Sequence, residues 1–396
     1  MLDERTILAD IARRLLDYDR EGTTAMAPRP HLHDPSSYTD PARFEREREA
    51  LFLKTPQLVC FSSDLPEAGS FRTFDALGVP LLLIRGDDGR VRAFLNACAH
   101  RGMRLKDGCG KARLLTCRYH AWSYRLDGAL KAINAEPTFG QVDKQSYGLT
   151  ELPAAEDYGM VFAAASPGVE IDIEAMLGEL APLFRHWDLG SLQHIKSGEF
   201  HVDTNWKLAL DTFCEGYHFA SLHRDSVADF ALSNVSDFLT FGPDGRNHRL
   251  AFPNTTIRAW HDAPEAEWGS ADDIFAQFQL VHFIYPNISL LISPRACELF
   301  QIYPGPAVGQ HVTHYSSYWR GNAALDSDEA RAEAEAHFDF IWQVVETEDY
   351  AAGAAVQRSL NSGLVRRTTF GRNEPALINM HTAFERALAP VAAEAV

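Results

Sequence analysis

Long apolar runs, cysteines and net positive charge are all scarce in this sequence. The longest uninterrupted apolar run in the first hundred residues, 79–84, is too short to cross a bilayer, and charges interrupt the apolar stretches of the N-terminus. Six cysteines among 396 residues exclude a disulfide scaffold and favour a reducing compartment. Lys and Arg number 37 against 54 Asp and Glu, and the net charge of −17 argues against nucleic acid as the main ligand. We therefore expect a soluble cytoplasmic protein with no membrane and no nucleic-acid partner.

The composition is that of an ordinary folded protein, with 46% hydrophobic and 23% charged residues. These fractions exclude disordered and fibrous classes, and the length predicts two or three domains. An apolar stripe at helical spacing runs through the first twenty residues, at Ile7, Leu8, Ile11, Leu15 and Leu16. We expect residues 1–40 to form an N-terminal helical segment that packs on the C-terminal domain.

Residues 58 to about 165 have the texture of short strands separated by turns. The runs 81–85 and 91–96 flank Gly-Asp-Asp-Gly, and the runs 123–126 and 129–133 flank Asp-Gly. Both patterns are typical of β-hairpins. The sequence predicts a small antiparallel β domain at residues 41–166.

Helical and strand-like segments are mixed from residue 167 to 396. Residues 205–223 have helical spacing, residues 248–320 read as successive strands, and residues 326–362 read as one or two long helices that begin at an N-cap, Asp326. The pattern predicts an antiparallel sheet flanked by helices, so the whole chain is expected to be an α+β protein.

Two Cys-His pairs form the strongest local signal in the β domain: Cys98-Ala-His100 and, sixteen residues later, Cys117-Arg-Tyr-His120. Ordinary packing roles are one interpretation, but clustered Cys and His at ligand spacing usually mark a metal. A tetrahedral zinc site is a second, although structural zinc usually shows Cys-x-x-Cys spacing. A [2Fe–2S] cluster with two thiolates on one iron and two imidazoles on the other is the third.

The residues around these pairs resemble the Rieske motif. Cys-Ala-His-Arg-Gly is followed by Cys-Arg-Tyr-His-Ala-Trp-Ser-Tyr and then by Asp127-Gly128. Arg118 and Ala121 stand where Pro and Gly are frequent, and neither departure removes a ligand. The loops lack the second cysteine pair of respiratory Rieske proteins, which resembles the oxygenase type. The resemblance implies a [2Fe–2S] cluster held by Cys98, His100, Cys117 and His120.

The segment around these pairs is basic. Residues 90–131 carry ten Lys or Arg and two acids, a local charge of +8 in a chain of −17. The charge either balances an anionic cluster or pairs with acids across a subunit interface; the functional interpretation, compatible with these, is a docking face for an acidic electron donor. Cys109 lies within the segment, and we interpret it as a free thiol.

A second group of candidate ligands lies about a hundred residues later. Asp211, Glu215 and His218 are spaced i, i+4 and i+7, which places them on one face of a helix. His223 follows five positions after His218, about 140° round an ideal helix, so the helix must end or distort for both to bind one metal. Two histidines and a carboxylate are the set that holds non-haem Fe(II) with open positions.

This stretch, with the preceding Asn-Trp-Lys, resembles the Asp/Glu-x-x-x-Asp/Glu-x-x-His-x-x-x-x-His signature of Rieske non-haem iron oxygenases, the ring-hydroxylating α subunits. The resemblance implies that His218 and His223 bind iron together with Asp349, from the late acidic run 344–349. Glu346 and Glu348 are alternative ligands. In the family a carboxylate bridges the cluster of one subunit to the iron of the next, and this role falls on Glu215. Such bridging implies a cyclic oligomer, most simply a homotrimer.

The resemblance implies a small Rieske domain and a catalytic domain of the helix-grip type, at residues 167–396. It implies a terminal oxygenase that uses O2 and electrons from NAD(P)H, delivered by a reductase and in some systems a ferredoxin. The substrate is expected to be a small, aromatic molecule that is hydroxylated or demethylated, with Glu215 and Asp211 as catalytic residues and Phe213, Phe219 and Phe230 as candidate pocket residues.

Glu215 in place of the commoner Asp also fits an oxygenase of quaternary ammonium compounds. The alternatives from other classes are a Rieske electron carrier without its own catalysis and a zinc-stabilised binding module.

Overall fold

The computed structural model describes residues 3–76, 78–321, 325 and 327–389 and divides the chain into two compact units. The first unit contains residues 1–48, 175–186 and 192–396, and the second contains residues 49–174 and 187–191. The main part of the second unit thus begins at residue 49 and ends at residue 174. The sequence suggested that this domain begins at residue 41 and ends at residue 166. Among the described residues, no helix is both long enough and apolar enough to span a membrane.

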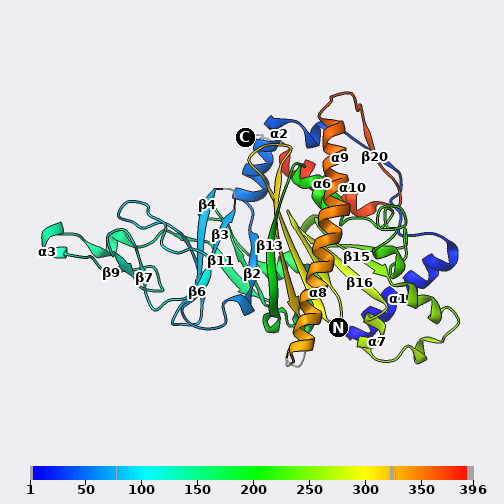
Figure 1. Cartoon of the computed structure of the whole chain (residues 1–396), viewed down its shortest axis with the longest axis horizontal. Helices are drawn as coiled ribbons and strands as arrows, with labels where there is room; N and C mark the ends of the chain where they lie inside the picture. The colour runs from blue at the N-terminus through cyan, green and yellow to red at the C-terminus, as the bar shows by residue number, and fades with distance from the viewer. Residues whose placement is uncertain (1–2, 77, 322–324, 326, 390–396) are drawn as a thin grey trace, which may run out of the picture. The chain divides into compact units, whose positions relative to one another are not determined.

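A seven-stranded antiparallel sheet forms the centre of the first unit, with the order β13-β19-β18-β17-β16-β15-β14 (Figure 1). Its strands are β13 (Gln193–Val202), β14 (Asp237–Phe241), β15 (Asn247–Pro253), β16 (Phe278–Ile284), β17 (Ile288–Ile292), β18 (Ala296–Pro304) and β19 (His311–Trp319). Every residue of β15 and β18 is buried. The sequence predicted the strands within residues 248–320, β15 to β19, because turns rich in Pro, Gly or Asn separate apolar runs there, but it did not predict β13 or β14. A separate two-stranded ladder joins β1 (His31–His33) to β20 (Thr368–Phe370).

Helices cover both faces of this sheet. Side chains alternate along β16, so Val281 and Phe283 face one way and His282 faces the other, where its ring lies 5.2 Å from the ring of Phe184. On the first face Phe283 lies 6.2 Å from Phe384 of α10. The α-helices of the unit and its borders are α1 (Glu4–Glu21), α2 (Pro41–Glu47), α4 (Ile173–Leu177), α5 (Ala181–Trp187), α6 (Trp206–Asp211), α7 (Ala271–Phe275), α8 (Asp328–Val344), α9 (Tyr350–Leu360) and α10 (Pro375–Leu388).

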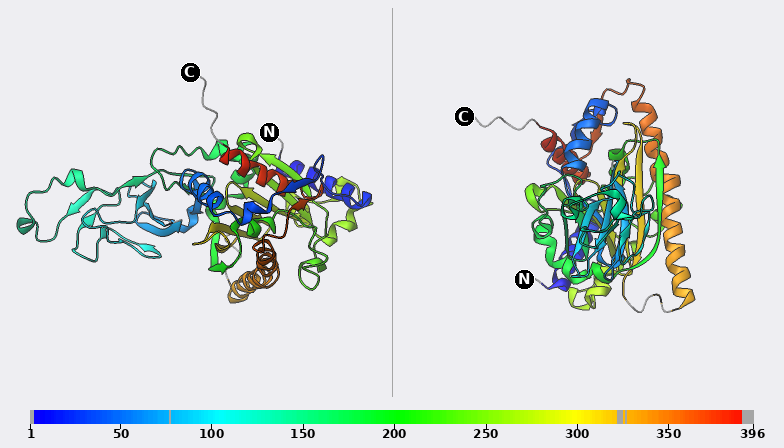
Figure 2. Two further views of the ribbon diagram at one scale, coloured as in Figure 1. Left: turned by 90° about the horizontal axis from the view of Figure 1, so that it is seen from above. Right: turned by 90° about the vertical axis from the view of Figure 1, so that its left-hand side faces the viewer.

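The segment from α8 to α9 is one continuous rod that runs beside the sheet (Figure 2, right-hand view). Its middle, Val345–Asp349, is π-helical. Ser327 is the N-cap of α8, and its side chain accepts a hydrogen bond from the backbone N–H of Ala330 at 3.1 Å. Asp326, which the sequence suggested for that role, lies outside the described residues.

A buried ion pair explains why residues 41–48 belong to the first unit. The ammonium of Lys207, the second residue of α6, lies 2.5 Å from a carboxylate oxygen of Glu47 in α2. Both side chains are fully buried, and Arg43 contacts the other oxygen of Glu47 at 2.8 Å. Removing one partner of such a pair leaves an uncompensated buried charge. Separating α2 from this unit would therefore carry a large free-energy cost. Glu47 and Lys207 are 160 positions apart in the chain, so residue spacing did not predict this pair.

The second unit is built from three small antiparallel sheets. Their orders are β10-β5-β4-β3-β6, β11-β12-β2 and β7-β8-β9. The strands are β2 (Gln57–Phe61), β3 (Ser70–Ala76), β4 (Val79–Arg85), β5 (Val91–Leu95), β6 (Cys109–Lys111), β7 (Leu115–Thr116), β8 (Ser123–Tyr124), β9 (Leu130–Ala132), β10 (Glu151–Leu152), β11 (Ala154–Asp157) and β12 (Met160–Ala163), and α3 (Glu136–Phe139) follows β9. Both predicted hairpins are present, as the β4–β5 and β8–β9 pairs. The chain is thus an α+β protein, as the sequence predicted.

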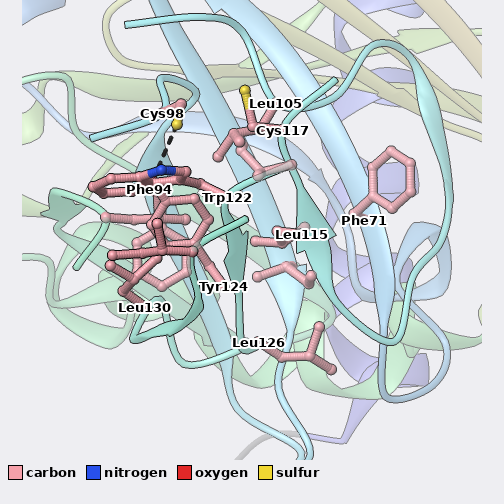
Figure 3. Packing of buried hydrophobic residues seen from close by; sticks show 14 residues of the cluster. Phe71, Phe94, Cys98, Leu105, Leu115, Cys117, Trp122, Tyr124, Leu126 and Leu130 are labelled. Atoms are coloured by element: carbon pink, nitrogen blue, oxygen red, sulfur yellow. Dashed lines mark hydrogen bonds between the residues drawn. The ribbon is translucent and has the colours of Figure 1, made fainter. Parts of the chain in front are cut away.

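One hydrophobic cluster of the second unit includes both motif cysteines (Figure 3). Cys98 and Cys117 pack there with Trp122, Tyr124 and Leu105, and each of these five residues is buried. The two loops that bear the cysteines are therefore anchored by the core of the unit, with their other residues turned outward.

Candidate metal centres

The first candidate centre lies in a loop, because helix α6 is much shorter than the sequence suggests. Asn205 caps the helix by accepting a hydrogen bond from the backbone of Lys207 at 3.0 Å, and the helix ends at Asp211. The prediction of one helical face across residues 205–223 is therefore wrong beyond that point. The carboxylate of Glu215 accepts backbone N–H groups of Tyr217 and His218, which folds the chain into successive turns instead.

Three side chains converge where this loop meets the α8–α9 rod: His218, His223 and Asp349. The Nε2 atoms of the two histidines lie 3.0 Å apart, and an Asp349 oxygen lies 3.5 Å from the first and 3.3 Å from the second. One donor atom from each residue falls within 4.8 Å of the others, and this is the one such group of three that the described part of the chain contains. His223 and Asp349 are buried, and His218 is half-buried.

The charges of these side chains are strongly coupled. Burial alone would lower the pKa of His218, but hydrogen bonds to Asp349 and Glu215 outweigh it and raise that pKa to about 9. Burial would likewise raise the pKa of Asp349, yet its contacts with both histidines hold it below the ordinary value. Neutral imidazoles and a carboxylate are the forms that bind a metal, so a cation in this position replaces the protons that the ion pairs now hold.

Each histidine is oriented by a carboxylate on its other ring nitrogen. Glu215 Oε1 lies 2.5 Å from Nδ1 of His218, and Glu348 Oε2 lies 2.6 Å from Nδ1 of His223. The hydroxyl of Ser226 donates to the same Glu348 oxygen at 2.8 Å. This arrangement fixes both rings with Nε2 toward Asp349, and it is the usual outer environment of metal-binding histidines.

The donor set fits a mononuclear non-haem iron. Two imidazoles and one carboxylate on one side of an ion leave its remaining positions open for other ligands. Asp349 reaches the histidines because it ends the π-helical segment, and such segments often occur at functional sites. Of the acidic run 344–349, Glu348 orients His223, while Glu346 accepts a hydrogen bond from the Trp342 indole and lies outside the donor set.

Asp211 is held away from this group by a different network. One of its oxygens accepts from the Tyr38 hydroxyl at 2.7 Å, and the other lies 2.8 Å from Nε2 of His381. The Tyr38 hydroxyl is also 3.3 Å from the same His381 nitrogen. The sequence suggested that Asp211 shares a face with Glu215 and His218; the end of α6 at Asp211 separates them.

A cavity of about 380 Å³ opens beside the three donors. Phe213, Phe219 and Phe230, the pocket residues suggested from sequence, all line it. The rest of the wall comes from strands β15 to β18 and from one face of α8. The lining also includes Glu298 and His337, which the sequence analysis missed. The sequence held one indication of this pair. Glu298 is a charged residue within the largely apolar stretch Cys-Glu-Leu-Phe of β18, at a position that faces inward.

The second candidate centre is the Cys-His cage. Cys98 and Cys117 are buried and in side-chain contact with each other, and the rings of His100 and His120 lie 4.7 Å apart. The thiol pair and the imidazole pair thus stand as two adjacent pairs, which fits a [2Fe–2S] cluster with thiolates on one iron and imidazoles on the other. The Tyr124 hydroxyl lies 3.1 Å from the Cys98 sulfur and accepts the backbone N–H of Ala99 at 3.0 Å.

The basic segment around the cage is partly neutralised within its own unit. Arg92 binds Asp88, Lys111 binds Glu67, and Arg118 binds Asp107. These pairs support charge balance as one purpose of the segment. Cys109 is exposed in β6 and is a free cysteine, as the sequence suggested.

Two family models match the chain. Residues 189–389 match the model of the ring hydroxylating alpha subunit (catalytic domain), and residues 55–148 match the model of the Rieske [2Fe–2S] domain. The first match covers more than half of the chain and includes all three donors of the first centre. The second includes all four residues of the cage.

Individual relatives are similar over parts of their length. The chain is 34% identical over 197 residues to the carnitine monooxygenase oxygenase subunit of Acinetobacter baumannii, which covers 48% of this chain and 53% of that protein. It is 30% identical over 308 residues to the biphenyl 2,3-dioxygenase subunit alpha of Rhodococcus jostii, with 74% and 60% covered. The chain thus spans little more than half the length of these curated relatives.

Solved structures are similar over nearly the whole chain. A quaternary ammonium Rieske monooxygenase in complex with an inhibitor superimposes with a TM-score of 0.75 at 20% identity, covering 95% of this chain and 98% of the other. A naphthalene 1,2-dioxygenase with bound indole gives a TM-score of 0.71 at 16% identity, covering 92% and 93%. These likenesses confirm the α+β fold that the sequence predicted.

Proposed function

The chain belongs to the ring hydroxylating alpha subunit family, and we propose that it is the terminal oxygenase of a Rieske non-haem iron system. The family confirms the resemblance that the two sequence motifs carry. The observation that supports the proposal most directly is the convergence of His218, His223 and Asp349 beside a largely apolar cavity. An electron carrier without its own catalysis does not need a cavity beside a metal site. A zinc-stabilised binding module does not need a second metal site with open positions.

Each group of residues has a proposed role. Cys98, His100, Cys117 and His120 hold the [2Fe–2S] cluster, and His218, His223 and Asp349 hold Fe(II). When bound, the two groups supply electron transfer and dioxygen chemistry. The chain's own side chains position them: Glu215 and Glu348 fix the imidazoles, and the Tyr124 hydroxyl lies against a cluster thiolate. The phenylalanines of the cavity exclude water from the reacting substrate.

Glu215 has a second proposed role at a subunit boundary. It would link His218 to His120 of the partner subunit, so that electrons pass between chains rather than within one. A solved relative of this fold has been described in terms of inter-subunit electron transfer. A head-to-tail arrangement of this kind closes as a ring, and a homotrimer is the simplest ring. Asp211, the other residue expected to be catalytic, is hydrogen-bonded to Tyr38 and His381 instead and is assigned no part in the link.

The electrons come from NAD(P)H through a reductase and, in a three-component system, a ferredoxin. The basic segment 90–131 provides the docking charge for an acidic donor. The substrate is a small, aromatic molecule that is hydroxylated or demethylated with O2, in the cytoplasm.

A second candidate function is oxidation of a quaternary ammonium compound. It is favoured by Glu215 in the bridging position and by the similarity to the oxygenase subunit of carnitine monooxygenase. It shares the metal centres and the electron path with the first candidate, so the two differ only in what the cavity binds.

Iron content and a single-turnover experiment test the proposal. We expect about three irons and two labile sulfides per chain, with the cluster's visible chromophore. The chemically reduced protein is then exposed to O2 with a pool of aromatic compounds or a pool of quaternary ammonium compounds, and products are identified by mass. An oxygenated aromatic product supports the first candidate and an oxidised ammonium compound the second. About two irons and no product from either pool would establish an electron carrier instead, and a colourless, iron-free protein would establish a zinc module.

A further inference from the structure

A buried carboxylate stands in the wall of the cavity. Alternation along β18 points Ala296, Glu298 and Phe300 to the same side, and all three line the cavity. The Glu298 side chain is 5% exposed. Its two oxygens accept hydrogen bonds from the Tyr315 hydroxyl at 2.6 Å and the Ser317 hydroxyl at 3.0 Å. Such an anion is costly to bury, and its neighbours on β19 hold it in one orientation.

His337 approaches this carboxylate from helix α8. Its Nε2 lies 3.1 Å from the Glu298 oxygen that Ser317 also binds, and its side chain is 37% exposed. Burial alone would lower the pKa of His337, but the hydrogen bond and the charge of Glu298 raise it above the ordinary value. An imidazole has a second ring nitrogen on its other edge. Because Nε2 contacts Glu298, Nδ1 is the ring nitrogen that a ligand in the cavity would use, and it donates when the ring is protonated.

The pair lies far along the cavity from the metal donors. His337, Phe340, Ile341 and Val344 form the face of α8 that lines the cavity, and Asp349 follows at the end of the π-helical segment. His337 lies seven positions before Val344, the end of α8, which corresponds to roughly 10 Å of α-helix rise, and the π-helical segment up to Asp349 adds to this distance. A single benzene ring cannot touch both ends, whereas an elongated molecule along α8 can.

The other lining residues indicate which molecule fits. Six phenylalanines line the cavity, and no Tyr, Trp, Lys or Arg occurs among its described lining residues. Phenylalanine walls suit an aromatic body, whereas cation–π recognition is strongest with Trp. A quaternary ammonium group also cannot use Nδ1 of His337, and the oxygens of Glu298 are already engaged by hydroxyls and by His337. Apart from the metal donors and Glu215, Glu298 and His337 are the ionisable side chains among these lining residues.

We propose that His337, positioned by Glu298, recognises an oxygen acceptor, a carboxylate or an amide carbonyl, at the end of an elongated aromatic substrate. His337 is the specificity-determining residue that touches the substrate, and Glu298 is a positioning residue that acts through it. The proposal rests on the proposed oxygenase function, because it treats the cavity as the site where the substrate meets the iron.

Binding of a matched ligand series tests the proposal without turnover. Biphenyl-4-carboxylate, biphenyl-4-carboxamide, 4-methylbiphenyl and biphenyl-4-yl-trimethylammonium share one body and differ in the end group, and benzoate shortens the body. Affinities for the iron-loaded, oxidised protein are measured by titration calorimetry. We expect the carboxylate or the carboxamide to bind at least tenfold more tightly than the methyl compound, since hydrogen bonds to a charged partner are strong. Benzoate should bind more weakly than its biphenyl counterpart.

Variants of the pair separate recognition from folding. His337→Leu should make the acceptor compounds bind no better than 4-methylbiphenyl, with the affinity for 4-methylbiphenyl unchanged. His337→Gln, which keeps a donor, should restore part of the preference. Glu298→Gln should reduce the preference without abolishing it. Glu335→Gln, at an exposed position of α8, is the matched control and should leave every affinity unchanged.

Three outcomes would overturn the proposal. They are an unchanged preference in His337→Leu, tightest binding of the trimethylammonium compound, or no binding of any biphenyl compound to a protein that holds its full iron. All three leave the oxygenase function standing, because iron content and single turnover with the broader pools test that function independently. Failure of the function shows itself instead as missing iron at the His218 site or as the absence of any oxygenated product.

Discussion

The two candidate metal centres of this chain are built in opposite ways. The cage of the second unit takes its four residues from two short loops, 98–100 and 117–120, next to strands of the same small domain. The centre of the first unit joins the loop after α6 to a helix more than a hundred positions later. Its surroundings are acidic, with Glu215 and Glu348 on the histidines, whereas the cage lies in a segment of charge +8. A local motif therefore identifies the Cys-His cage, whereas only the folded chain assembles the centre of His218, His223 and Asp349.

Replacing His218 with Ala should separate the two centres most completely. The variant loses one of two imidazoles in the iron site, so we expect turnover to be abolished and iron to fall from about three to about two per chain. The visible chromophore of the cluster should remain, because Cys98, His100, Cys117 and His120 are untouched. Iron analysis and absorption spectra check this. Loss of the chromophore as well would mean that the centres are not independent.

Replacing Glu215 with Gln should sever the proposed connection between the centres while leaving both in place. The amide still contacts His218 but no longer carries the charge that orients it and links it to the next subunit. We expect both metals to bind and the rate of cluster oxidation in single turnover to fall on the order of a hundredfold, as for other outer partners of metal ligands. Stopped-flow absorbance measures this rate.

Glu346→Gln is the matched control for that experiment. Glu346 is exposed on the same rod as Asp349 and contacts the Trp342 indole rather than the donors. Its cluster oxidation rate should equal that of the unmodified protein. Equal rates in Glu215→Gln and Glu346→Gln would rule out the bridging role.

Acid should weaken the first unit through its buried histidines. Burial lowers the pKa of His248 and His282 to about 3 and that of His311 to about 4. The unfolded chain binds these protons near pH 6.5 and the folded chain does not. The free energy of unfolding should therefore fall as pH drops from about 6.5 towards 4, by about 1.4 kcal/mol per pH unit for each histidine. Above pH 7 these groups add no pH dependence.

Thermal unfolding followed by circular dichroism between pH 8 and pH 5 measures this effect. The cluster chromophore serves as an internal reference for the second unit in the same samples. A melting temperature that stays constant from pH 7 to pH 5 would contradict the assignment of these histidines as buried and neutral.

Tyr124→Phe should have the smallest effect and should be confined to the cage. The hydroxyl lies 3.1 Å from the Cys98 sulfur, and a donor to a thiolate stabilises the reduced, more negative state of a cluster. Losing one hydrogen bond of about 1 kcal/mol should lower the reduction potential by about 40 mV. A spectroscopic redox titration measures the shift, and iron at the His218 site should be unaffected. An unchanged potential would mean that the hydroxyl does not donate to the sulfur.

The comparison of the two centres also shows what the sequence could predict. Both hairpins and the Cys-His cage follow from local spacing, because turns and loop ligands are set by neighbouring residues. The strands β15 to β19 follow from apolar runs between turns. The end of α6 does not, since the carboxylate of Glu215 and the backbone N–H groups it binds replace a helix that the spacing allowed. The resemblance to a family located Asp349, but residue spacing alone gave no reason to prefer it over Glu348.

Ion pairs between distant segments could not be predicted from the sequence for a different reason. Glu47 and Lys207 are charged residues of two different helices, yet they are fully buried against each other. Glu298 and His337 belong to different elements whose contact depends on how α8 lies on the sheet. A charge in an apolar strand signals that a partner exists, but only packing identifies which one.

The π-helical segment Val345–Asp349 has a consequence for how such a centre arises and is lost. A π turn closes over one residue more than an α turn, so the segment holds one residue more than the same length of α-helical winding. If residues 345–349 wound as an ordinary α-helix instead, Asp349 would shift by about one residue position, which is about 100° around the rod relative to α8. The carboxylate would then turn away from His218 and His223 although every ligand residue is still encoded. The winding of one turn thus separates a scaffold with three metal ligands from one with two, without a substitution at any of them.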